Sequence, residues 1–583
     1  MNKILLLLSL ISSMTLLSAL NRPNVIVIMS DDQGAGDYGF AGNKLIKTPS
    51  LDAMQKRGGF INNFYVSSVC APTRASLITG RYNYRTRCVD TYIGRAMMDA
   101  KEITIAEFLE KAGYRTGIYG KWHMGDNYPL RAMDQGFQDS LVHRGGGIGQ
   151  PSDPIGAEGK YTDPTLIKNG EEVALKGYCT DIYFDAAMEF IEKSKKQKKN
   201  FFTFIATNAP HGPFHDVPPE LYEAYTKVDF SPIMIHSLKG DRLAKENDKL
   251  ARISAMITNI DENVGRLFKR LDQLELTENT IVIYLNDNGP NGARFVGNMR
   301  GAKASVDDGG IRSPLLMHWP SKIKAGTIID KQCAHIDILP SILDACNVEA
   351  PKNLLDGRSF LRLLTEGETN WPTRQLVFQT HRGDEPQLYH HFAIHEEPWK
   401  LVHPSGFGRE KLVGDLALQL YNLEADPMQK NDLASSKPEI VRHLKKSYEA
   451  WFKEVSETRP DNYAPPRIVI GTDHEVRSVL TRQDWRHNNE SGRPWAPDSN
   501  GSWLLEAPKA QNYSVDLYFL GNHPAGKAVV HAAGKSEIVD VPENASHVMI
   551  NNMKLPAGKM KLVADVTFGD KVQGPHQLIL TRK

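Results

Sequence analysis

A single cysteine stands in a stretch that could place a nucleophile at the start of a helix. The stretch reads Cys70-Ala71-Pro72-Thr73-Arg74-Ala75-Ser76-Leu77-Ile78-Thr79-Gly80-Arg81. Pro72 suits the first turn of a helix and helix formers follow it, so Cys70 is expected at or just before a helix N-terminus. Free N–H groups and partial positive charge at that position suit a nucleophile that faces an anionic substrate. The plainer alternative is a buried cysteine beside a helix.

Carboxylates follow two apolar runs that predict strands buried on both faces of a parallel sheet. Asp31 and Asp32 come after the first run, and Asp287 and Asn288 come after the second. Open α/β sheets bind their ligands at the carboxyl ends of such strands. Adjacent carboxylates repel each other and need a cation or hydrogen-bond donors to stay charged together. The four side chains offer only oxygen ligands, which favours a hard cation such as Ca²⁺ or Mg²⁺, although Asp and Asn-Gly are also ordinary turn residues.

Basic side chains follow two more predicted strands and enter one further loop. Lys121 and His123 lie in Gly120-Lys121-Trp122-His123-Met124-Gly125, and His211 lies in Asn208-Ala209-Pro210-His211-Gly212-Pro213. Lys303 ends the loop Arg300-Gly301-Ala302-Lys303. A lone Lys or His in a loop is usually only solvated. Beside the carboxylates, however, these groups could bind an anion and transfer protons.

In their order along the chain, these segments resemble the motifs of the type I, formylglycine-dependent sulfatases of the alkaline phosphatase superfamily. The resemblance covers roughly residues 23–455. The segments that carry it are Asp31-Asp32, the Cys70 stretch, Gly120-Lys121-Trp122-His123, Ala209-Pro210-His211, Asp287-Asn288-Gly289, Arg300-Gly301-Ala302-Lys303, Gly309-Gly310-Ile311-Arg312-Ser313-Pro314 and Leu420-Tyr421-Asn422-Leu423-Glu424-Ala425-Asp426-Pro427.

The resemblance implies a reaction and a set of roles. In that family the cysteine is oxidised by a formylglycine-generating enzyme to formylglycine (3-oxoalanine), whose hydrate attacks the sulfur of a sulfate ester. The implied catalytic residues are Cys70 as precursor, Arg74 holding it, Lys121 and Lys303 binding sulfate, His211 or Lys303 protonating the leaving oxygen, and His123 taking the proton of the second hydroxyl. The implied ligands of one Ca²⁺ are Asp31, Asp32, Asp287, Asn288 and the modified Cys70.

Two loops are candidates for contacts with the rest of the substrate. His143 and Arg144 begin the first loop, and His381 and Arg382 begin the second. An export signal and a trailing β-domain favour a sulfated polysaccharide or oligosaccharide as substrate. Two alternatives stay open: a phosphomonoester or phosphonate hydrolase of the same superfamily, and a non-catalytic carbohydrate-binding protein in which Cys70 remains unmodified.

The elements that must position these residues point to an α/β fold. Residues 24–29, 115–119, 201–205 and 280–285 are expected as strands, and residues 179–191 and 253–271 as amphipathic helices, with Asp261 and Glu262 on a solvated face. The family implies a large mixed, mostly parallel sheet between helices over residues 21–370, and a small antiparallel C-terminal subdomain over residues 371–458.

The C-terminal part of the chain changes to the alternation of β-strands. Apolar residues at 513, 515, 517 and 519 alternate with polar ones, which predicts a β-sandwich over residues 467–583 after a proline-rich linker at 459–466. Trp485 and Trp503 are expected in its core rather than on a sugar-binding surface.

Composition limits the function classes. The chain of 583 residues is 41% hydrophobic and 24% charged, with a formal net charge of +1, which argues against non-specific nucleic-acid binding. Residues 1–20 read as a signal peptide, so a soluble periplasmic or secreted protein is expected, with an N-terminal anchor as the alternative. Five cysteines do not make a disulfide scaffold, and pairing among the four besides Cys70 is left open.

Overall fold

The computed structural model describes residues 22–583 apart from 293, 381, 384–385, 404–415, 458–462 and 488–492. The signal peptide expected over residues 1–20 and the candidate His381 therefore lie outside the described residues. Among the helices that are described, none combines the length and the apolar character needed to cross a membrane.

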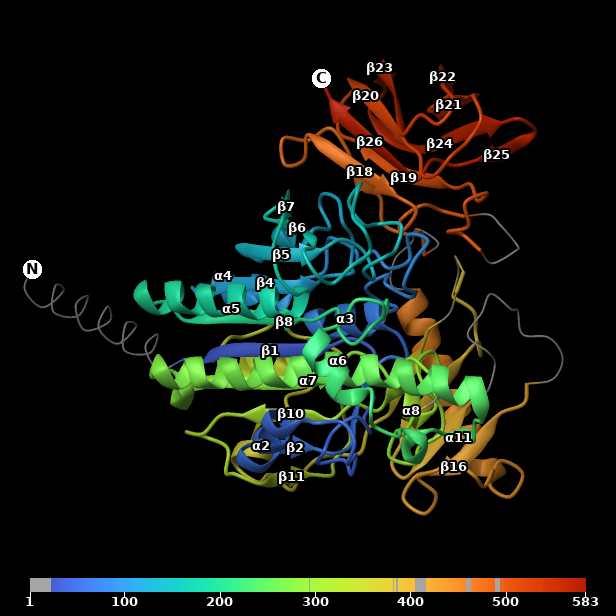
Figure 1. Cartoon of the computed structure of the whole chain (residues 1–583). Coiled ribbons are helices and arrows are strands. Elements are labelled where there is room, and N and C mark those ends of the chain that lie inside the picture. The colour runs from blue at the N-terminus through green and yellow to red at the C-terminus, as the bar shows by residue number, and fades with distance from the viewer. Residues whose placement is uncertain are drawn as a thin grey trace, which may run out of the picture.

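A ten-stranded, mostly parallel sheet forms the centre of the molecule (Figure 1). Strands β9, β1, β8, β4 and β5 run parallel to one another, and antiparallel neighbours flank them. In spatial order the strands are β11 (Thr327–Ile329), β2 (Gly59–Ile61), β10 (Leu315–His318), β9 (Thr280–Asn286), β1 (Asn24–Ser30), β8 (Phe201–Ala206), β4 (Arg115–Lys121), β5 (Asp139–His143), β6 (Thr165–Lys168) and β7 (Glu171–Ala174). The expected fold class is confirmed.

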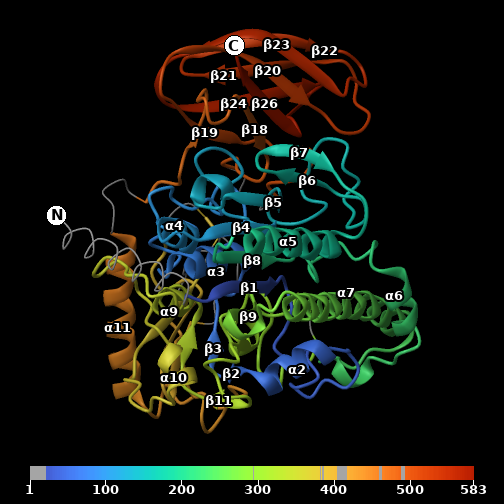
Figure 2. The same cartoon turned by 90° about the vertical axis from the view of Figure 1, so that its left-hand side faces the viewer.

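Helices cover both faces of this sheet (Figure 2). Alternate residues of β1 enter two separate cores, so its continuous apolar run is needed for burial on both sides. One core includes α3 (Cys70–Thr79), α4 (Ile105–Lys111), α9 (Ile338–Ala345) and α10 (Leu361–Thr365). The other includes α2 (Pro49–Arg57), α5 (Cys179–Lys196) and α7 (Gly240–Gln273), against which α6 (Pro219–Tyr225) packs.

One expectation for α7 is wrong. Asp261 is buried rather than solvated, and its carboxylate accepts the backbone N–H groups of Ser50 and Leu51 at 3.0 and 2.8 Å. It thereby satisfies free donors in the first turn of α2, a role that depends on a contact between residues more than two hundred positions apart. Glu262 is exposed, as expected.

A four-stranded antiparallel sheet follows at the carboxyl end of the large domain, as expected. Its order is β13 (Leu376–Gln379), β14 (Phe392–Glu396), β15 (Trp399–Val402) and β16 (Gln419–Asn422), and α11 (Pro438–Ser456) packs on it. Two short elements link it to the centre: α8 (Asp308–Ile311) and the pair β3 (Phe64–Tyr65) with β12 (Cys333–Ala334). Lys400 of β15 forms a buried ion pair with Asp308 of α8 at 2.8 Å.

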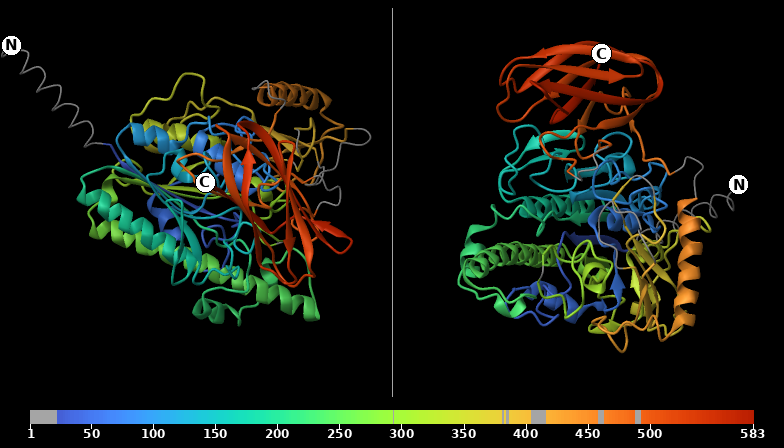
Figure 3. Two further views of the ribbon diagram at one scale, coloured as in Figure 1. Left: turned by 90° about the horizontal axis from the view of Figure 1, so that it is seen from above. Right: turned by 90° about the vertical axis from the view of Figure 1, so that its right-hand side faces the viewer.

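The C-terminal β-sandwich lies beside β5, β6 and β7 of the large sheet (Figure 3). One sheet holds β17 (Ile468–Val469), β19 (Ser502–Ala507), β24 (Gly558–Phe568), β21 (Gly526–Ala532), β22 (Lys535–Val541) and β25 (Lys571–Gln573). The other holds β18 (Arg477–Thr481), β26 (Gln577–Arg582), β20 (Gln511–Tyr518) and β23 (His547–Leu555). Trp485 and Trp503 are completely buried in the core between them, as expected.

The structure describes only part of the expected proline-rich linker. Residues 459–462 lie outside the described part, and Tyr463 is buried, with the Arg87 and Arg95 guanidinium groups 4.4 and 5.0 Å from its ring centre.

All five cysteines are free thiols, so the open question of pairing is answered in favour of no disulfide.

Candidate active site

Cys70 is the first residue of α3, as its sequence predicts. The helix is buried along its whole length, and it ends at Gly80, whose φ of 66° is a left-handed conformation suited to glycine. The Cys70 thiol is only 3% exposed and faces the carboxyl ends of β1, β4 and β9 across a small polar centre. The helix N-terminus adds partial positive charge at that point.

The four oxygen-bearing residues meet at the ends of two adjacent strands. Ser30 of β1 pairs with Asn286 of β9, so the residues that follow each strand start level with one another. The Asp32 N–H donates to Asp287 Oδ1 at 3.2 Å, and Asn288 Nδ2 donates to Asp32 Oδ1 at 2.8 Å. Asp32 has a φ of 63°, which turns the chain sharply at this point. All four side chains are buried.

Three cations surround these carboxylates. Arg74 donates to Asp287 Oδ2 at 2.8 Å and to the Lys121 carbonyl at 2.9 Å, so it links α3 to both β9 and β4. Lys121 forms an ion pair with Asp31, and Lys303 forms one with Asp32 Oδ1 at 2.5 Å. Each carboxylate therefore has a basic partner in a site from which water is largely excluded.

Close strand packing brings Lys121 to this centre. Gly120, at φ 122°, lies so near β8 that a Cβ atom there would stand 1.8 Å from the Ala206 carbonyl oxygen. A larger residue would push β4 away from β8 and carry Lys121 with it. Glycine at position 120 is therefore a requirement of the site.

The site also fits a bound cation. Buried oxygens of three residues, Asp31 Oδ1, Asp32 Oδ2 and Asn288 Oδ1, lack a hydrogen-bond partner among the described residues. Ligand atoms of Asp31, Cys70 and Asp287 lie within 4.8 Å of one another. Buried polar atoms normally find partners, so this cluster of oxygens is suited to a hard divalent ion.

Burial and neighbouring charges shift the pKa values at this centre. Burial and the nearby Asp31 charge raise the pKa of Asp287 to about 6, a shift that a cation between them would oppose. Burial opposes ionisation of Asp32, but Lys303 and His211 hold its pKa below the usual range. Burial lowers the pKa of Lys303, but the surrounding negative groups, Asp32 first, together raise it by more, so this lysine is charged at neutral pH.

Two histidines, in the loops that follow β4 and β8, line the cavity at Cys70. His123 Nε2 lies 2.7 Å from the Thr91 carbonyl oxygen, which can only accept, so Nε2 carries the proton. Nδ1 is then the free base, 3.4 Å from Cys70 Sγ. His211 Nδ1 likewise faces the Gly212 carbonyl at 2.7 Å, and its Nε2 lies 3.8 Å from Asp32.

Both histidines are neutral in the absence of substrate. Burial and the Lys121 charge lower the pKa of His123 well below its ordinary value. Burial lowers the pKa of His211 to about 4, although the Asp32 charge opposes the shift. His123 is thus ready to accept a proton, whereas His211 gains one only when a negative charge arrives beside it.

A cavity of about 690 Å³ opens above Cys70. His123, His211, Lys303 and the candidate Arg382 line it. Several other residues that line it were not among the predicted site residues, namely Thr91, Tyr92, Asn291, Arg493 and Trp495. The only signal for the last two was a Pro-flanked tryptophan, Arg493-Pro494-Trp495-Ala496-Pro497, in a loop of the sandwich region.

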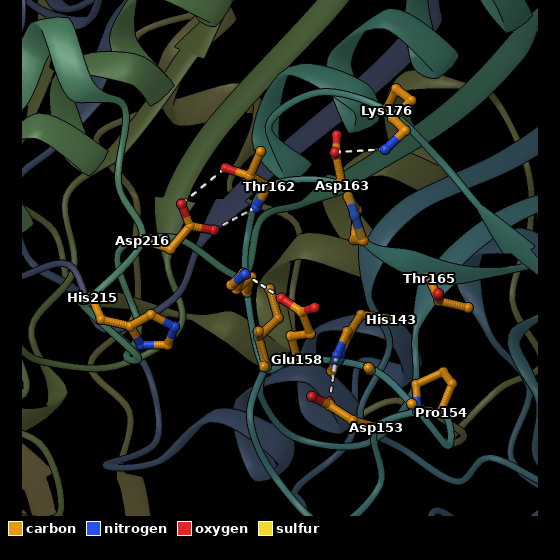
Figure 4. A pocket seen from close by; sticks show the side chains of 16 residues that line it. His143, Asp153, Pro154, Glu158, Thr162, Asp163, Thr165, Lys176, His215 and Asp216 are labelled. Carbon is orange, nitrogen blue, oxygen red and sulfur yellow. Dashed lines mark hydrogen bonds and ion pairs between the residues drawn. The ribbon is translucent and has the colours of Figure 1, made fainter.

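His143 and Arg144 line two other cavities. His143 Nε2 lies 3.0 Å from Asp153 Oδ1 on the wall of a cavity of about 610 Å³, where Glu158, Asp216 and Lys176 also lie (Figure 4). Arg144 lines a third cavity and lies 3.3 Å from Glu172. Of their loop, Gly146 and Gln150 reach the Cys70 cavity instead.

Family models and relatives agree with this geometry. A model described as "Sulfatase" matches residues 23–348, and one described as "N-sulphoglucosamine sulphohydrolase, C-terminal" matches residues 302–454. The chain is 28% identical to the N-acetylgalactosamine-6-O-sulfatase of Bacteroides thetaiotaomicron over 74% of its own length and 93% of that protein.

Solved structures share the architecture. Ps i-CgsB, in its crystal structure in complex with k-i-k-neocarrahexaose, is 26% identical to this chain, with a TM-score of 0.63 over 74% of this chain and 93% of that one. The phosphonate monoester hydrolase SpPMH of Silicibacter pomeroyi, 18% identical with a TM-score of 0.53 over 76% and 96%, shares the fold alone. With more than half of its length matched by the family model, the chain belongs to the sulfatase family and is a hydrolase of sulfate esters.

Proposed function

We propose that this protein is an exported sulfatase that removes sulfate from a polysaccharide or oligosaccharide, using a formylglycine hydrate derived from Cys70 and one Ca²⁺. The observation that carries the proposal is the convergence of three cations, two neutral histidines and unpartnered oxygens on Cys70. Support for a sugar substrate comes from relatives named for a sulfated amino sugar and from a homologous structure with a bound neocarrahexaose.

The calcium ligands in this proposal are Asp31, Asp32, Asp287, Asn288 and the modified residue 70. When bound, the ion would polarise the sulfate oxygens and favour the ionised form of a nearby hydroxyl. Three carboxylates and three cations already balance each other here, so a divalent ion leaves the site positive. A net positive site is suited to a sulfate ester.

The protonation state of the Cys70 thiol supports the proposal that the working nucleophile is a modified residue. Burial raises the pKa of the Cys70 thiol, although Lys121 and Lys303 oppose the shift, so the unmodified thiol is protonated and a weak nucleophile. A formylglycine hydrate at position 70 would supply two hydroxyls, one to attack sulfur with departure of the sugar alcohol and one whose deprotonation would release sulfate. A thiol or serine ester has no second hydroxyl for that elimination.

Different side chains of the site bind the sulfate, position residue 70 and transfer protons. Lys121 and Lys303 bind the sulfate oxygens, where negative charge develops in the transition state. Arg74 holds Asp287 and the Lys121 backbone, and so fixes the position of residue 70. His123 Nδ1 is placed to take a proton from a hydroxyl on the side chain of residue 70.

Protonation of the leaving oxygen falls to His211 or Lys303. Lys303 is charged in the free enzyme, and His211 becomes an acid only after the bound sulfate ester raises its depressed pKa. Such a general acid typically contributes about 10²–10⁴ in rate. A formylglycine-generating enzyme and a signal peptide complete the proposed path to a periplasmic or secreted enzyme.

Sulfate release from a panel of defined sulfated oligosaccharides, beside an aryl sulfate and an aryl phosphate, tests the proposed function. We expect sulfate from at least one oligosaccharide and a strong preference for aryl sulfate over aryl phosphate. A large preference for phosphate would favour the phosphomonoester or phosphonate hydrolase. Binding of a sulfated glycan without any sulfate release would indicate a non-catalytic binding protein.

A further inference from the structure

The C-terminal sandwich is fixed to the large domain by contacts near the catalytic cavity. Asn127 exchanges two hydrogen bonds with the Val479 backbone, at 2.9 and 3.0 Å. The Gly94 N–H donates to the Gln483 carbonyl at 3.1 Å, and Met97 and Leu130 of the large domain enter the sandwich core. These contacts hold the sandwich in a constant position relative to Cys70.

A loop of the sandwich region, residues 493–497, forms one wall of the cavity above Cys70. This wall loop is supported from behind: Trp495 Nε1 donates to the Arg482 carbonyl at 3.0 Å, and Arg482 Nη1 donates to the Ala496 carbonyl at 2.6 Å. The Trp495 ring meets Tyr92 of the large domain edge-on, with ring centres 5.4 Å apart. These contacts on both sides hold the loop in place as part of the cavity wall.

Gln483, close before the wall loop, also contacts the catalytic machinery. Its Nε2 donates to the Thr91 carbonyl oxygen at 2.6 Å, the same oxygen that accepts the His123 Nε2 proton. The sandwich thus reaches the cavity at two places, one behind His123 and one at the wall.

The cavity is positively charged beyond the sulfate position. Its lining residues include Lys303, Arg382 and Arg493, and no Asp or Glu is among those that line it in the described part of the chain. Lys303 is paired with Asp32, and Arg382 donates to the Tyr92 hydroxyl at 2.7 Å and lies 4.0 Å from the buried Asp90. Arg493 is exposed, and its side chain makes no hydrogen bond or ion pair with any described residue.

We propose that the wall loop is a specificity element: Arg493, with Arg382 of the same cavity, binds a second anionic group of the substrate, and Trp495, held by Tyr92, packs against the sugar ring that bears it. This inference rests on the proposed sulfatase function and narrows its substrate to a glycan with a sulfate or carboxylate beside the sulfate that is removed. Arginine is the residue best suited to either group, since its planar fork binds both bidentately.

Two matched oligosaccharides test this inference. One carries only the sulfate to be removed, and the other carries in addition a sulfate, or in a parallel arm a carboxylate, on the neighbouring sugar. We expect wild-type kcat/KM to be about ten- to a hundredfold higher for the dianionic glycan, as expected for a hydrogen bond to a charged group, and the Arg493→Gln variant to lower that preference by about the same factor. The arm with the larger loss identifies the anion.

Arg477→Gln is the matched control, because Arg477 is an exposed arginine of the same sandwich that lines a different cavity. It should leave the preference unchanged. Equal wild-type rates on the two glycans, or an unchanged preference in Arg493→Gln, would overturn the inference while leaving the sulfatase proposal intact. Absence of sulfate release by the wild type from both glycans and from every oligosaccharide of the panel would overturn the proposed function, and this inference with it.

Discussion

The catalytic edge of the large sheet and the core of the C-terminal sandwich are both buried, but they are built from opposite kinds of residue. At the catalytic edge, Asp31, Asp287 and Arg74 are completely buried charges. Between the two sheets of the sandwich, the buried core is a cluster of apolar side chains that includes Trp485 and Trp503. Burial of charged groups costs free energy, whereas burial of apolar groups stabilises the fold. The catalytic edge is therefore less stable than an apolar core would be, and the sandwich core contributes stability.

Removal of one buried charge should produce the largest effect. Arg74→Ala leaves Asp287 without its partner beside Asp31, so we expect the free energy of unfolding to fall by about 3–5 kcal/mol. We also expect kcat/KM for an aryl sulfate to fall by at least about 10³-fold, because the group that positions residue 70 is lost. Denaturant unfolding and steady-state kinetics measure the two effects. A variant that keeps near-wild-type turnover would contradict the role of Arg74.

Truncation of a sandwich tryptophan should affect stability alone. Trp503→Ala removes a completely buried ring, and we expect the sandwich to lose about 3–5 kcal/mol of stability. Per folded molecule, turnover of an aryl sulfate should stay within about tenfold of wild type, since Trp503 does not line the catalytic cavity. A loss as large as that of Arg74→Ala would mean that the two regions do not divide stability and chemistry in this way.

Replacement of His123, the proposed base, should lower the catalytic rate without a large change in stability. For His123→Ala we expect kcat to fall by about 10²–10⁴-fold, since Nδ1 is the proton acceptor nearest residue 70. Its melting temperature should change little, because a neutral histidine leaves no buried charge behind. A normal kcat in this variant would assign the proton transfer to another group.

The smallest effect concerns Asp261, a buried carboxylate far from catalysis. Burial raises its pKa to about 6 although the Ser50 and Leu51 N–H groups oppose the shift, so the folded state binds a proton more tightly than the unfolded state does. Its contribution to stability therefore increases as pH falls from about 6 toward 4 and is lost as pH rises through 6.

We expect Asp261→Asn to remove that pH dependence and to cost about 1–3 kcal/mol at neutral pH, because one of two buried backbone donors loses its acceptor. Unfolding measured at pH 4, 5, 6 and 7 in both proteins isolates this group. Parallel stability curves for the two proteins would contradict the assignment.

The elements that depend on a local pattern of residues could be predicted from the sequence. The apolar runs ending before Asp31 and Asp287 predicted buried strands, and Pro72 predicted the start of α3. Prediction failed where a role depends on a distant partner, as for Asp261, which caps a helix far away in the chain. The wall loop escaped it for the same reason, because only docking of the sandwich brings Trp495 to the cavity.

Side chains of neighbouring positions in one loop can also enter different cavities. His143 and Arg144 were expected to contact substrate, yet Gly146 and Gln150, a few residues on, are the ones that reach the Cys70 cavity. The direction of each side chain in an irregular loop depends on tertiary contacts, such as that of His143 with Asp153, which no local pattern contains.

Mass spectrometry of the peptide that contains Cys70, from active protein made in an exporting host with a formylglycine-generating enzyme, tests the central claim most directly. We predict an aldehyde in place of the thiol, in proportion to the sulfatase activity of each preparation. We also predict that Cys70→Ala has no turnover, although it folds. Full sulfatase activity from protein whose Cys70 is entirely an unmodified thiol would contradict the account.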